Sequence, residues 1–421
     1  MQPDHLSEIS FASLPLHPTL QAGLQKLNYS HCTPIQAQTL PLALAGHDIA
    51  GQAQTGTGKS AAFLLATMHR LLTHPRREGD DGRNPRAFMM APTRELAIQI
   101  LKDAEQLGSE TGLRMMVCYG GAGYETQRTA LEAGVDILIG TPGRLIDFYK
   151  QGTYNLKYIE VLVLDEADRM FDLGFIDDIR YIIRKMPPPA ARRNYLFSAT
   201  LSQRVLELAF EHMNEPRRVE VKPEQMTADK VRQAMLHVSN HDKLPLLIGL
   251  LRRYDPYRTL VFVNTKRGAE EVENGLRVNG FDARVLSGDV AQTKRIQLLT
   301  DFKEGRLPIL VATDVAARGL HIPNVSHVIN YDLPQDREDY VHRIGRTARA
   351  GEAGDAISFC CESYAFGLPD IEKFIGSKIP MLEGGHDLVA TDFIRPEPPK
   401  HHFRERHGKP RQGGPRHRRR R

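Results

Sequence analysis

The chain has 421 residues, of which 41% are hydrophobic and 25% are charged, a composition typical of globular proteins with two or three domains. It contains no run of 18 apolar residues and its first ten residues are polar, so the sequence indicates neither a membrane-spanning helix nor a secretory signal, and we expect a cytoplasmic protein. The net charge of +5 is uneven, because residues 395–421 hold 11 Lys or Arg against Glu397 and Glu405, which gives this tail +9 and the rest of the chain −4.

The first feature that carries chemistry is a glycine-rich loop, Ala53-Gln54-Thr55-Gly56-Thr57-Gly58-Lys59-Ser60. Residues 49–50 resemble the end of a strand and residues 61–72 an amphipathic helix, so the loop is expected at a helix N-terminus, where free N–H groups favour an anion. The strict phosphate-loop pattern has Gly in place of Ala53, and an ordinary loop with a solvated lysine is the alternative. We predict that the loop binds phosphates and that the Ser60 hydroxyl reaches Mg²⁺.

Short apolar, β-branched runs then alternate with helical stretches, which is the pattern of a parallel sheet covered by helices. In the first half these runs are residues 87–91, 115–119, 135–140, 160–164 and 195–198. A polar segment around Pro223 is predicted to be a linker, and a second series follows it at residues 260–263, 283–286, 308–313, 326–330 and 356–360. We therefore predict an α/β protein with two parallel-sheet lobes in tandem.

The predicted strand at 160–164 is followed at once by Asp165-Glu166-Ala167-Asp168. This places carboxylates at the carboxyl end of a buried parallel strand, where nucleotide-binding α/β proteins carry out their chemistry. Asp165 is expected to hold magnesium through water, and Glu166 to orient or deprotonate the attacking water. An acidic helix cap is the alternative for the tetrad alone. Together with the glycine-rich loop, the tetrad predicts a nucleoside triphosphate site.

These motifs, with others in the same order, resemble those of the DEAD-box ATP-dependent RNA helicases over about residues 11–376. The resemblance implies two RecA-like parallel-sheet lobes followed by a disordered basic tail. It also implies a division into five segments. These are an N-terminal adenine-recognition segment (residues 1–39), an ATP-binding RecA-like domain (40–220), a linker (221–240), a C-terminal RecA-like helicase domain (241–390) and the tail (391–421).

The resemblance also implies that the cofactors are ATP and Mg²⁺. Gln36, in Cys32-Thr33-Pro34-Ile35-Gln36, would bond the adenine edge and Tyr29 would stack on its face. The implied cofactor-binding residues are Phe11, Tyr29, Gln36, Ala53, Gln54, Thr55, Gly56, Thr57, Gly58, Lys59 and Ser60, and the implied metal ligands are Ser60 and Asp165.

RNA contacts are implied on both lobes by residues 92–97, 120–121 and 141–144 in the first, and 292–295 and 313–314 in the second. The implied RNA-binding residues are Arg94, Gly121, Thr141, Arg144, Arg295 and Thr313. Ser198-Ala199-Thr200 resembles the segment that couples hydrolysis to strand separation, so Ser198 and Thr200, together with His342, are the implied coupling residues.

The segment 342–349 is similar to the family's arginine-finger motif, and an exposed basic helix is the alternative for it alone. Charge that spreads over the γ-phosphoryl group in the transition state must be met by fixed cations, which here would arrive when the lobes close. The implied catalytic residues are Lys59, Asp165, Glu166, Arg346 and Arg349.

Three positions depart from the family pattern: Ser60 replaces Thr, Ala348 replaces Gly, and His321 replaces an Asp that is expected to meet the nucleotide ribose. The His, together with Leu16-His17-Pro18 and residues 357–365, is similar to a bacterial branch of the family that takes part in mRNA degradation. The implied function is an RNA-dependent ATPase that unwinds RNA duplexes locally.

For that branch, endoribonuclease E and other RNA degradosome components are the expected partners besides RNA. The alternatives from other functional classes are a nucleotide-independent RNA-binding chaperone and a DNA-stimulated ATPase. The basic tail is predicted to tether RNA by charge, with a role in solubility or partner docking as its alternative.

Overall fold

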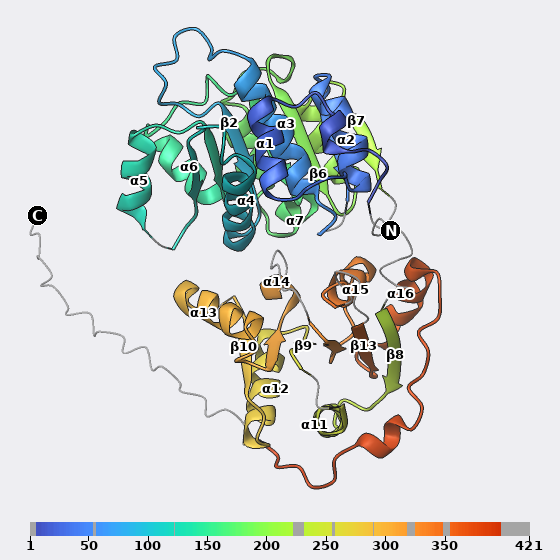
Figure 1. The fold of residues 1–421 in the computed structure, drawn as a ribbon. Helices are drawn as coiled ribbons and strands as arrows, with labels where there is room; N and C mark the ends of the chain where they lie inside the picture. The colour runs from blue at the N-terminus through green and yellow to red at the C-terminus, as the bar shows by residue number, and fades with distance from the viewer. Residues whose placement is uncertain are drawn as a thin grey trace, which may run out of the picture.

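The structure is a computed structural model, and it describes residues 6–53, 56–121, 123–221, 231–254, 257–288, 290–317, 325–347 and 354–396. Within these residues two parallel sheets form two lobes, which Figure 1 shows one above the other. The predicted tandem of parallel-sheet lobes is therefore confirmed. No helix in the described part of the chain is long and apolar enough to cross a membrane.

The first sheet has seven described strands in the order β3-β4-β2-β5-β6-β1-β7, and every pair in it is parallel. The strands are β1 (Ile49–Gln52), β2 (Ala87–Met90), β3 (Met115–Cys118), β4 (Ile137–Gly140), β5 (Val161–Asp165), β6 (Arg193–Ser198) and β7 (Arg217–Glu220). The helices of this lobe are α1 (Pro18–Lys26), α2 (Pro34–Leu44), α3 (Lys59–Thr73), α4 (Arg94–Leu107), α5 (Tyr124–Glu132), α6 (Pro142–Lys150), α7 (Ala167–Asp172), α8 (Ile176–Ile183) and α9 (Gln203–His212), with 3-10 turns η1 (Phe11–Ser13) and η2 (Pro189–Ala191).

The second sheet has six described strands, also all parallel, in the order β10-β11-β9-β12-β13-β8. The strands are β8 (Val231–His237), β9 (Thr259–Phe262), β10 (Ala283–Leu286), β11 (Ile309–Ala312), β12 (His327–Asn330) and β13 (Gly354–Cys360). The helices are α11 (Lys243–Tyr254), α12 (Lys266–Val278), α13 (Gln292–Lys303), α14 (Asp314–Ala317), α15 (Arg337–Ile344) and α16 (Leu368–Ile375), with 3-10 turns η3 (Ala365–Gly367) and η4 (Gly385–Leu388).

Each sheet is buried on both faces because its strands are apolar at consecutive positions. In β5, Val161 and Val163 pack under α1 to α4, whereas Leu162 and Leu164 pack on the opposite face under α6, α8 and α9. The second sheet repeats this arrangement, with Leu260 on the face covered by α13 to α16 and Val261 on the face covered by α11 and α12. Such continuous apolar runs are what allowed the central strands to be predicted.

Two edge strands were not predicted, and one of them corrects the predicted linker. Residues 221–240 were assigned to a linker, but Val231–His237 forms β8 at the edge of the second sheet, paired with β13. Only Val231, Met235 and Leu236 of β8 are buried, so the strand lacks the apolar run that marks the central ones. The other missed strand, β7, is exposed at three of its four residues.

The start of the predicted tail is also corrected. Residues 391–396 were assigned to it, but they contact the second lobe: Arg252 pairs with Asp392 at 2.6 Å, and the Ile394 N–H donates to Asn279 Oδ1 at 2.7 Å. Residues 397–421, which carry most of the predicted tail, lie outside the described residues.

The two sheets direct their carboxyl ends toward each other. In Figure 1, α7, which follows β5, lies at the face of the first lobe that is turned to α14 and α15 of the second. Loops that follow strands of both sheets therefore meet in the cleft between the lobes, which is where ligands bind in parallel α/β proteins.

Candidate active site

The glycine-rich loop turns directly into α3, as predicted. Gly56 and Gly58 have φ of +90° and +89°, in the left-handed region that L side chains rarely adopt. A Cβ on Gly58 would lie 2.4 Å from Gln36 Nε2, so glycine is needed here for both its backbone conformation and its space. The N–H of Ala53 donates to the carbonyl of Ser198 at 2.9 Å, which joins the loop to the predicted coupling segment. Gln54 and Thr55 lie outside the described residues.

Lys59 begins α3 and extends to the two carboxylates that follow β5. Its Nζ lies 3.1 Å from Asp165 Oδ1 and 3.9 Å from Glu166 Oε1, and all three side chains are almost fully buried. The backbone of Glu166 has a φ of +54°, which is uncommon for a residue with a side chain and is stabilised by its N–H bond to Asp165 Oδ1 at 2.9 Å. The glycine-rich loop and the acidic tetrad thus meet in one buried cluster.

The environment drives the pKa values of the two carboxyls in opposite directions. Burial raises the pKa of Asp165, and the charge of Glu166 adds to this, while Lys59 opposes it. Burial also acts to raise the pKa of Glu166, but Lys59, Arg169 and Arg346 outweigh it and hold that pKa below its usual value. For Lys59, the carboxylates Asp165, Glu166 and Asp168 overcome burial and raise its pKa. Glu166 and Lys59 are therefore ionised at neutral pH.

The same cluster offers oxygen ligands for a hard cation. Asp165 Oδ2 is buried and has no hydrogen-bond partner among the residues that the structure describes. Ser60 lies half-buried in the first turn of α3, next to Lys59. A hydroxyl, a carboxylate and phosphate oxygens suit Mg²⁺, which usually takes one or two protein ligands and keeps several waters. The residues present fit the predicted metal.

Asp168, to which the sequence analysis gave no role, fixes the coupling segment. Its Oδ2 accepts hydrogen bonds from the N–H groups of Ala199 and Thr200, both at 3.1 Å, and from the Thr200 hydroxyl at 3.3 Å. In return, its own N–H donates to Ser198 Oγ at 3.1 Å. These contacts between loops 30 residues apart leave no pattern in the sequence, although the position of Asp168 in the tetrad does mark it. The acidic tetrad and residues 198–200 are therefore one rigid unit.

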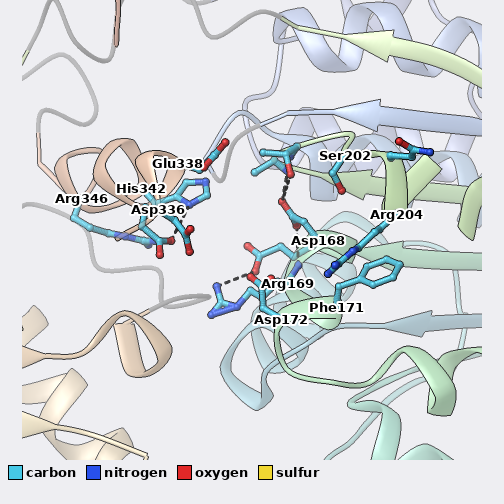
Figure 2. Close-up of a pocket in the computed structure, with 15 residues that line it drawn as sticks. Asp168, Arg169, Phe171, Asp172, Ser202, Arg204, Asp336, Glu338, His342 and Arg346 are labelled. Carbon is cyan, nitrogen blue, oxygen red and sulfur yellow. Dashed lines mark hydrogen bonds and ion pairs between the residues drawn. The ribbon is translucent and has the colours of Figure 1, made fainter. Parts of the chain in front are cut away.

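A cavity of about 490 Å³ opens between the lobes beside this unit (Figure 2). Glu166, Asp168 and Thr200 line it from the first lobe, and His342 and Arg346 line it from the second. Arg346 is 4% exposed and close enough for its charge to lower the pKa of Glu166. The structure thus brings one predicted arginine finger and His342 to the acidic tetrad. Arg349 lies outside the described residues, as do His321 and Ala348.

Arg343, which was not singled out in the sequence, is the centre of a buried network in the second lobe. Its Nε donates to Asp314 Oδ1 at 2.7 Å, and its Nη2 donates to Asp314 Oδ2 at 2.6 Å and to Asn264 Oδ1 at 2.7 Å. It also donates to the carbonyl of Asp332. Arg343 therefore fixes α15, which carries His342, against the loops that follow β9, β11 and β12.

The predicted RNA-binding residues of the first lobe gather at the carboxyl ends of β2, β3 and β4. The Arg94 guanidinium lies against Gly121, where a Cβ would be 2.5 Å from Nη1, and the φ of +88° at Gly121 also requires glycine. Arg144 stacks on Tyr124 at 4.9 Å and donates to Gln127 Oε1. Thr141, at the start of the same helix α6, donates its N–H to the carbonyl of Cys118. Cations and backbone groups thus line one edge of this sheet.

The predicted RNA-binding residues of the second lobe occupy the opposite side of the cleft. Arg295 pairs with Glu95 of the first lobe at 2.7 Å and donates to the carbonyl of Ala316 at 2.6 Å. The carbonyl of Thr313 accepts the N–H groups of Ala316 and Ala317, which begins α14. In this structure the Arg295 guanidinium therefore holds the lobes together, and the partner that it uses, Glu95, was not predicted.

The predicted adenine-recognition residues lie in the N-terminal segment before β1, and one of them, Gln36, contacts the glycine-rich loop. The rings of Phe11 and Tyr29 are stacked at 6.4 Å, with Phe11 buried and Tyr29 49% exposed. Gln36 accepts the Thr33 N–H through Oε1 at 2.8 Å and donates to the Gly58 carbonyl at 2.9 Å. Gln36 therefore contacts the glycine-rich loop directly, and the Tyr29 ring leaves about half of its surface open for stacking.

Comparison with known proteins agrees with this geometry. The sequence matches the DEAD/DEAH box helicase family over residues 33–208 and the helicase conserved C-terminal domain over residues 242–351. It is 56% identical to the ATP-dependent RNA helicase RhlB of Actinobacillus succinogenes, over 94% of this chain and 95% of that protein. It is 58% identical to RhlB of Pasteurella multocida, over 93% of this chain and 91% of that protein.

Among solved structures, the fold matches S. cerevisiae Dbp5 bound to RNA and ADP BeF3, with a TM-score of 0.77 and 31% identity over 90% of this chain and 97% of that chain. A Dbp5 variant bound to Nup159, a Gle1 variant, IP6 and ADP gives a TM-score of 0.61, with 30% identity over 89% of this chain and 97% of that chain. The chain belongs to the DEAD-box family of ATP-dependent RNA helicases.

Proposed function

We propose that the chain binds ATP with Mg²⁺ in the cleft between its lobes and uses the hydrolysis to open short RNA duplexes locally. The observation that carries this proposal is the cavity in which Glu166, with its buried partner Lys59, faces Arg346 of the other lobe. A triphosphate site that needs both lobes would be complete only when they are closed, so RNA that favours closure would stimulate ATP turnover.

In this proposal, each charged side chain acts at a defined atom. Lys59 and the N–H groups at the start of α3 bind the phosphates. Glu166, ionised because its pKa is lowered, accepts the proton of the attacking water. Arg346 neutralises charge that develops on the γ-phosphoryl oxygens. Ser60 and, through water, Asp165 would hold Mg²⁺, which would supply Lewis-acid stabilisation of negative charge on the phosphates.

The proposed RNA path crosses both lobes at the carboxyl ends of the strands. Arg94, Arg144, Gly121 and Thr141 would contact the RNA backbone on the first lobe, with Arg295 and Thr313 on the second. Contacts to phosphates and 2′-hydroxyls carry no base information, so binding would not depend on sequence. The TM-score is higher against Dbp5 bound to RNA and ADP BeF3 than against the Dbp5 variant bound to Nup159, a Gle1 variant, IP6 and ADP, which supports a lobe arrangement like that of an RNA-bound relative.

The roles of Lys59 and Glu166 are tested by steady-state ATPase with and without RNA. Glu166→Gln keeps the shape but removes the base, and Lys59→Ala removes the phosphate contact. We expect both variants to lose RNA-stimulated turnover by about a hundredfold or more. Unaltered turnover in both would exclude these assignments. A nucleotide-independent chaperone would instead unwind RNA without ATP, and a DNA-stimulated ATPase would respond to DNA; no observed feature favours either.

We also propose that the protein acts in cytoplasmic mRNA degradation, with endoribonuclease E and other RNA degradosome components as partners. The support is the high identity to RhlB proteins together with the sequence features at Leu16-His17-Pro18 and residues 357–365. Co-purification with endoribonuclease E at physiological salt is the test, and failure to associate would count against this partner.

The basic residues after 395 are proposed to hold RNA near the cleft by charge. The expected result of deleting residues 395–421 is weaker RNA binding and a shallower dependence of RNA affinity on salt concentration. An unchanged salt slope would remove this role.

A further inference from the structure

A buried ion pair lies in the second lobe away from the cleft. Lys243 at the start of α11 and Asp332 after β12 are 3% and 5% exposed, and Lys243 Nζ lies 2.5 Å from Asp332 Oδ1. The ammonium also lies 5.0 Å from the ring of Tyr331 and 5.2 Å from that of Tyr364. Neither charged residue lines the cavity beside Glu166. None of the ATP or RNA contacts proposed above involves this pair.

The pair is the first link of a hydrogen-bond chain that ends in the cleft. Asp332 Oδ2 accepts the N–H of Asn264 at 2.9 Å, and Asn264 Oδ1 accepts Arg343 Nη2 at 2.7 Å. Arg343 then forms a two-point contact with Asp314 at 2.6 and 2.7 Å. The chain therefore joins α11, the loops after β9 and β12, and helices α14 and α15 through charged or amide groups only.

The position of α15 depends on these contacts. Arg343 is 1% exposed, and its guanidinium binds Asp314 at the start of α14 and the carbonyl of Asp332 after β12, which anchors α15 to both. His342 is the adjacent residue of that helix, and Arg346 lies two residues beyond its last residue, Ile344; both line the cavity that Glu166 lines. A shift of α15 would move both side chains relative to Glu166, and displacement of a catalytic group by about 1 Å can cost up to a hundredfold in rate.

We propose that Lys243 and Asp332 are positioning residues for the arginine-finger segment: they fix Asn264, which with Asp314 fixes Arg343 and thereby sets Arg346 against the first lobe. A purely stabilising role would not need charge, because a buried ion pair replaced by apolar residues of similar size often leaves stability unchanged. The inference rests on the proposed catalytic role of Arg346, and the two can fail separately.

The central experiment compares Lys243→Met with the double variant Lys243→Met/Asp332→Leu. The single variant leaves a buried carboxylate without its partner, so it should lower both the thermal midpoint and the RNA-stimulated kcat, the latter by about tenfold. In the double variant the thermal midpoint should recover, whereas kcat should stay low because the Asn264 N–H has lost its acceptor. The KM for ATP should change little in both, since the first lobe holds the phosphates.

Two further variants serve as rescue and control. Lys243→Arg keeps the charge, and the cavity of about 570 Å³ that Lys243 and Asp332 line has room for a guanidinium, so kcat should return to near the wild-type value. Arg252→Met removes another ion pair of α11, the exposed one with Asp392, and should leave kcat unchanged.

Recovery of kcat together with the thermal midpoint in the double variant would overturn the proposal, and so would wild-type kcat in Lys243→Met. If the double variant does not fold, the effects of Asp332→Asn and Asn264→Ala on kcat decide. Because both residues belong to one hydrogen-bond chain, the loss of kcat in the combined variant should be smaller than the two single losses together, and full additivity would contradict the proposal. Wild-type turnover in Arg346→Met would instead show that the proposed catalytic role of Arg346 is wrong.

Discussion

Arg295 of the second lobe and Glu95 of the first form an ion pair across the cleft, with 2.7 Å between Nε and Oε1. Both side chains are nearly buried, at 10% and 14% exposure, so water screens the pair less than a surface ion pair. Arg295 was predicted to bind RNA, and in this structure it holds the lobes in the arrangement that also brings Arg346 to Glu166. In this proposal, closure of the lobes and the RNA contact both depend on Arg295.

Glu95→Gln is expected to loosen closure, because it keeps the size of the side chain but removes its charge. The RNA concentration that gives half-maximal ATPase should rise by about fivefold or more, the usual range of coupling between sites. Titration of RNA in a steady-state ATPase assay measures this. Glu105→Gln, on the same helix α4 but exposed, is the control. Equal RNA dependence in both variants would show that the pair does not contribute to closure.

Gly58→Ala should weaken ATP binding for two reasons, a clash of the new Cβ and strain of the backbone. The Cβ would meet Gln36 Nε2 at 2.4 Å, and the φ of +89° strains a side-chain-bearing residue by about 1 to 2 kcal/mol. We expect the KM for ATP to rise by about tenfold. Gly152→Ala is the matched control, because Gly152 has a φ of +73° but open space around it. A KM that rises equally in both variants would mean that the contact with Gln36 has no part in ATP binding.

Asp168→Asn should separate ATP hydrolysis from strand separation. The amide has one acceptor oxygen where Asp168 uses two, Oδ2 for the N–H groups of Ala199 and Thr200 and Oδ1 for the N–H of Arg169, so one set of bonds is lost and the coupling segment would no longer move with the tetrad. We expect RNA unwinding to fall by about tenfold and RNA-stimulated ATPase to fall less. Parallel unwinding and ATPase assays on one preparation would test this, and a matched loss of both activities would argue against the coupling role.

The central strands could be predicted because their consecutive apolar, β-branched residues are buried on both faces. The edge strands β7 and β8 could not, because one side of an edge strand meets solvent and its residues are mixed. For the site, the motifs identified the groups with local patterns, such as the loop at Lys59 and the carboxylates of the tetrad. Arg343, Glu95 and Lys243 escaped prediction because their partners lie far away in the chain, and the sequence does not show which buried charges meet.

Stability should depend on pH through Asp103 of α4. Burial raises the pKa of this carboxyl from 3.8 to about 6, so the folded state binds the proton more tightly than the unfolded state. The ionised carboxylate of Asp103 therefore lowers the free energy of unfolding. This loss is absent below about pH 4, grows between about pH 4 and 6, and is complete above about pH 6. Because Asp103 is partly exposed, Asp103→Asn should raise the free energy of unfolding at pH 7 by only about 1 kcal/mol. Urea unfolding at pH 7 and pH 4.5 would test this; a gain that is not smaller at pH 4.5 would contradict the shift.

The most direct test of the account is the RNA-stimulated kcat of Arg346→Met, because this residue of the second lobe is proposed to complete a site built on Lys59 and Glu166 of the first. The account predicts a loss of about a hundredfold or more, with the KM for ATP changed little. Turnover equal to that of the wild-type protein, at saturating RNA and ATP, would contradict it.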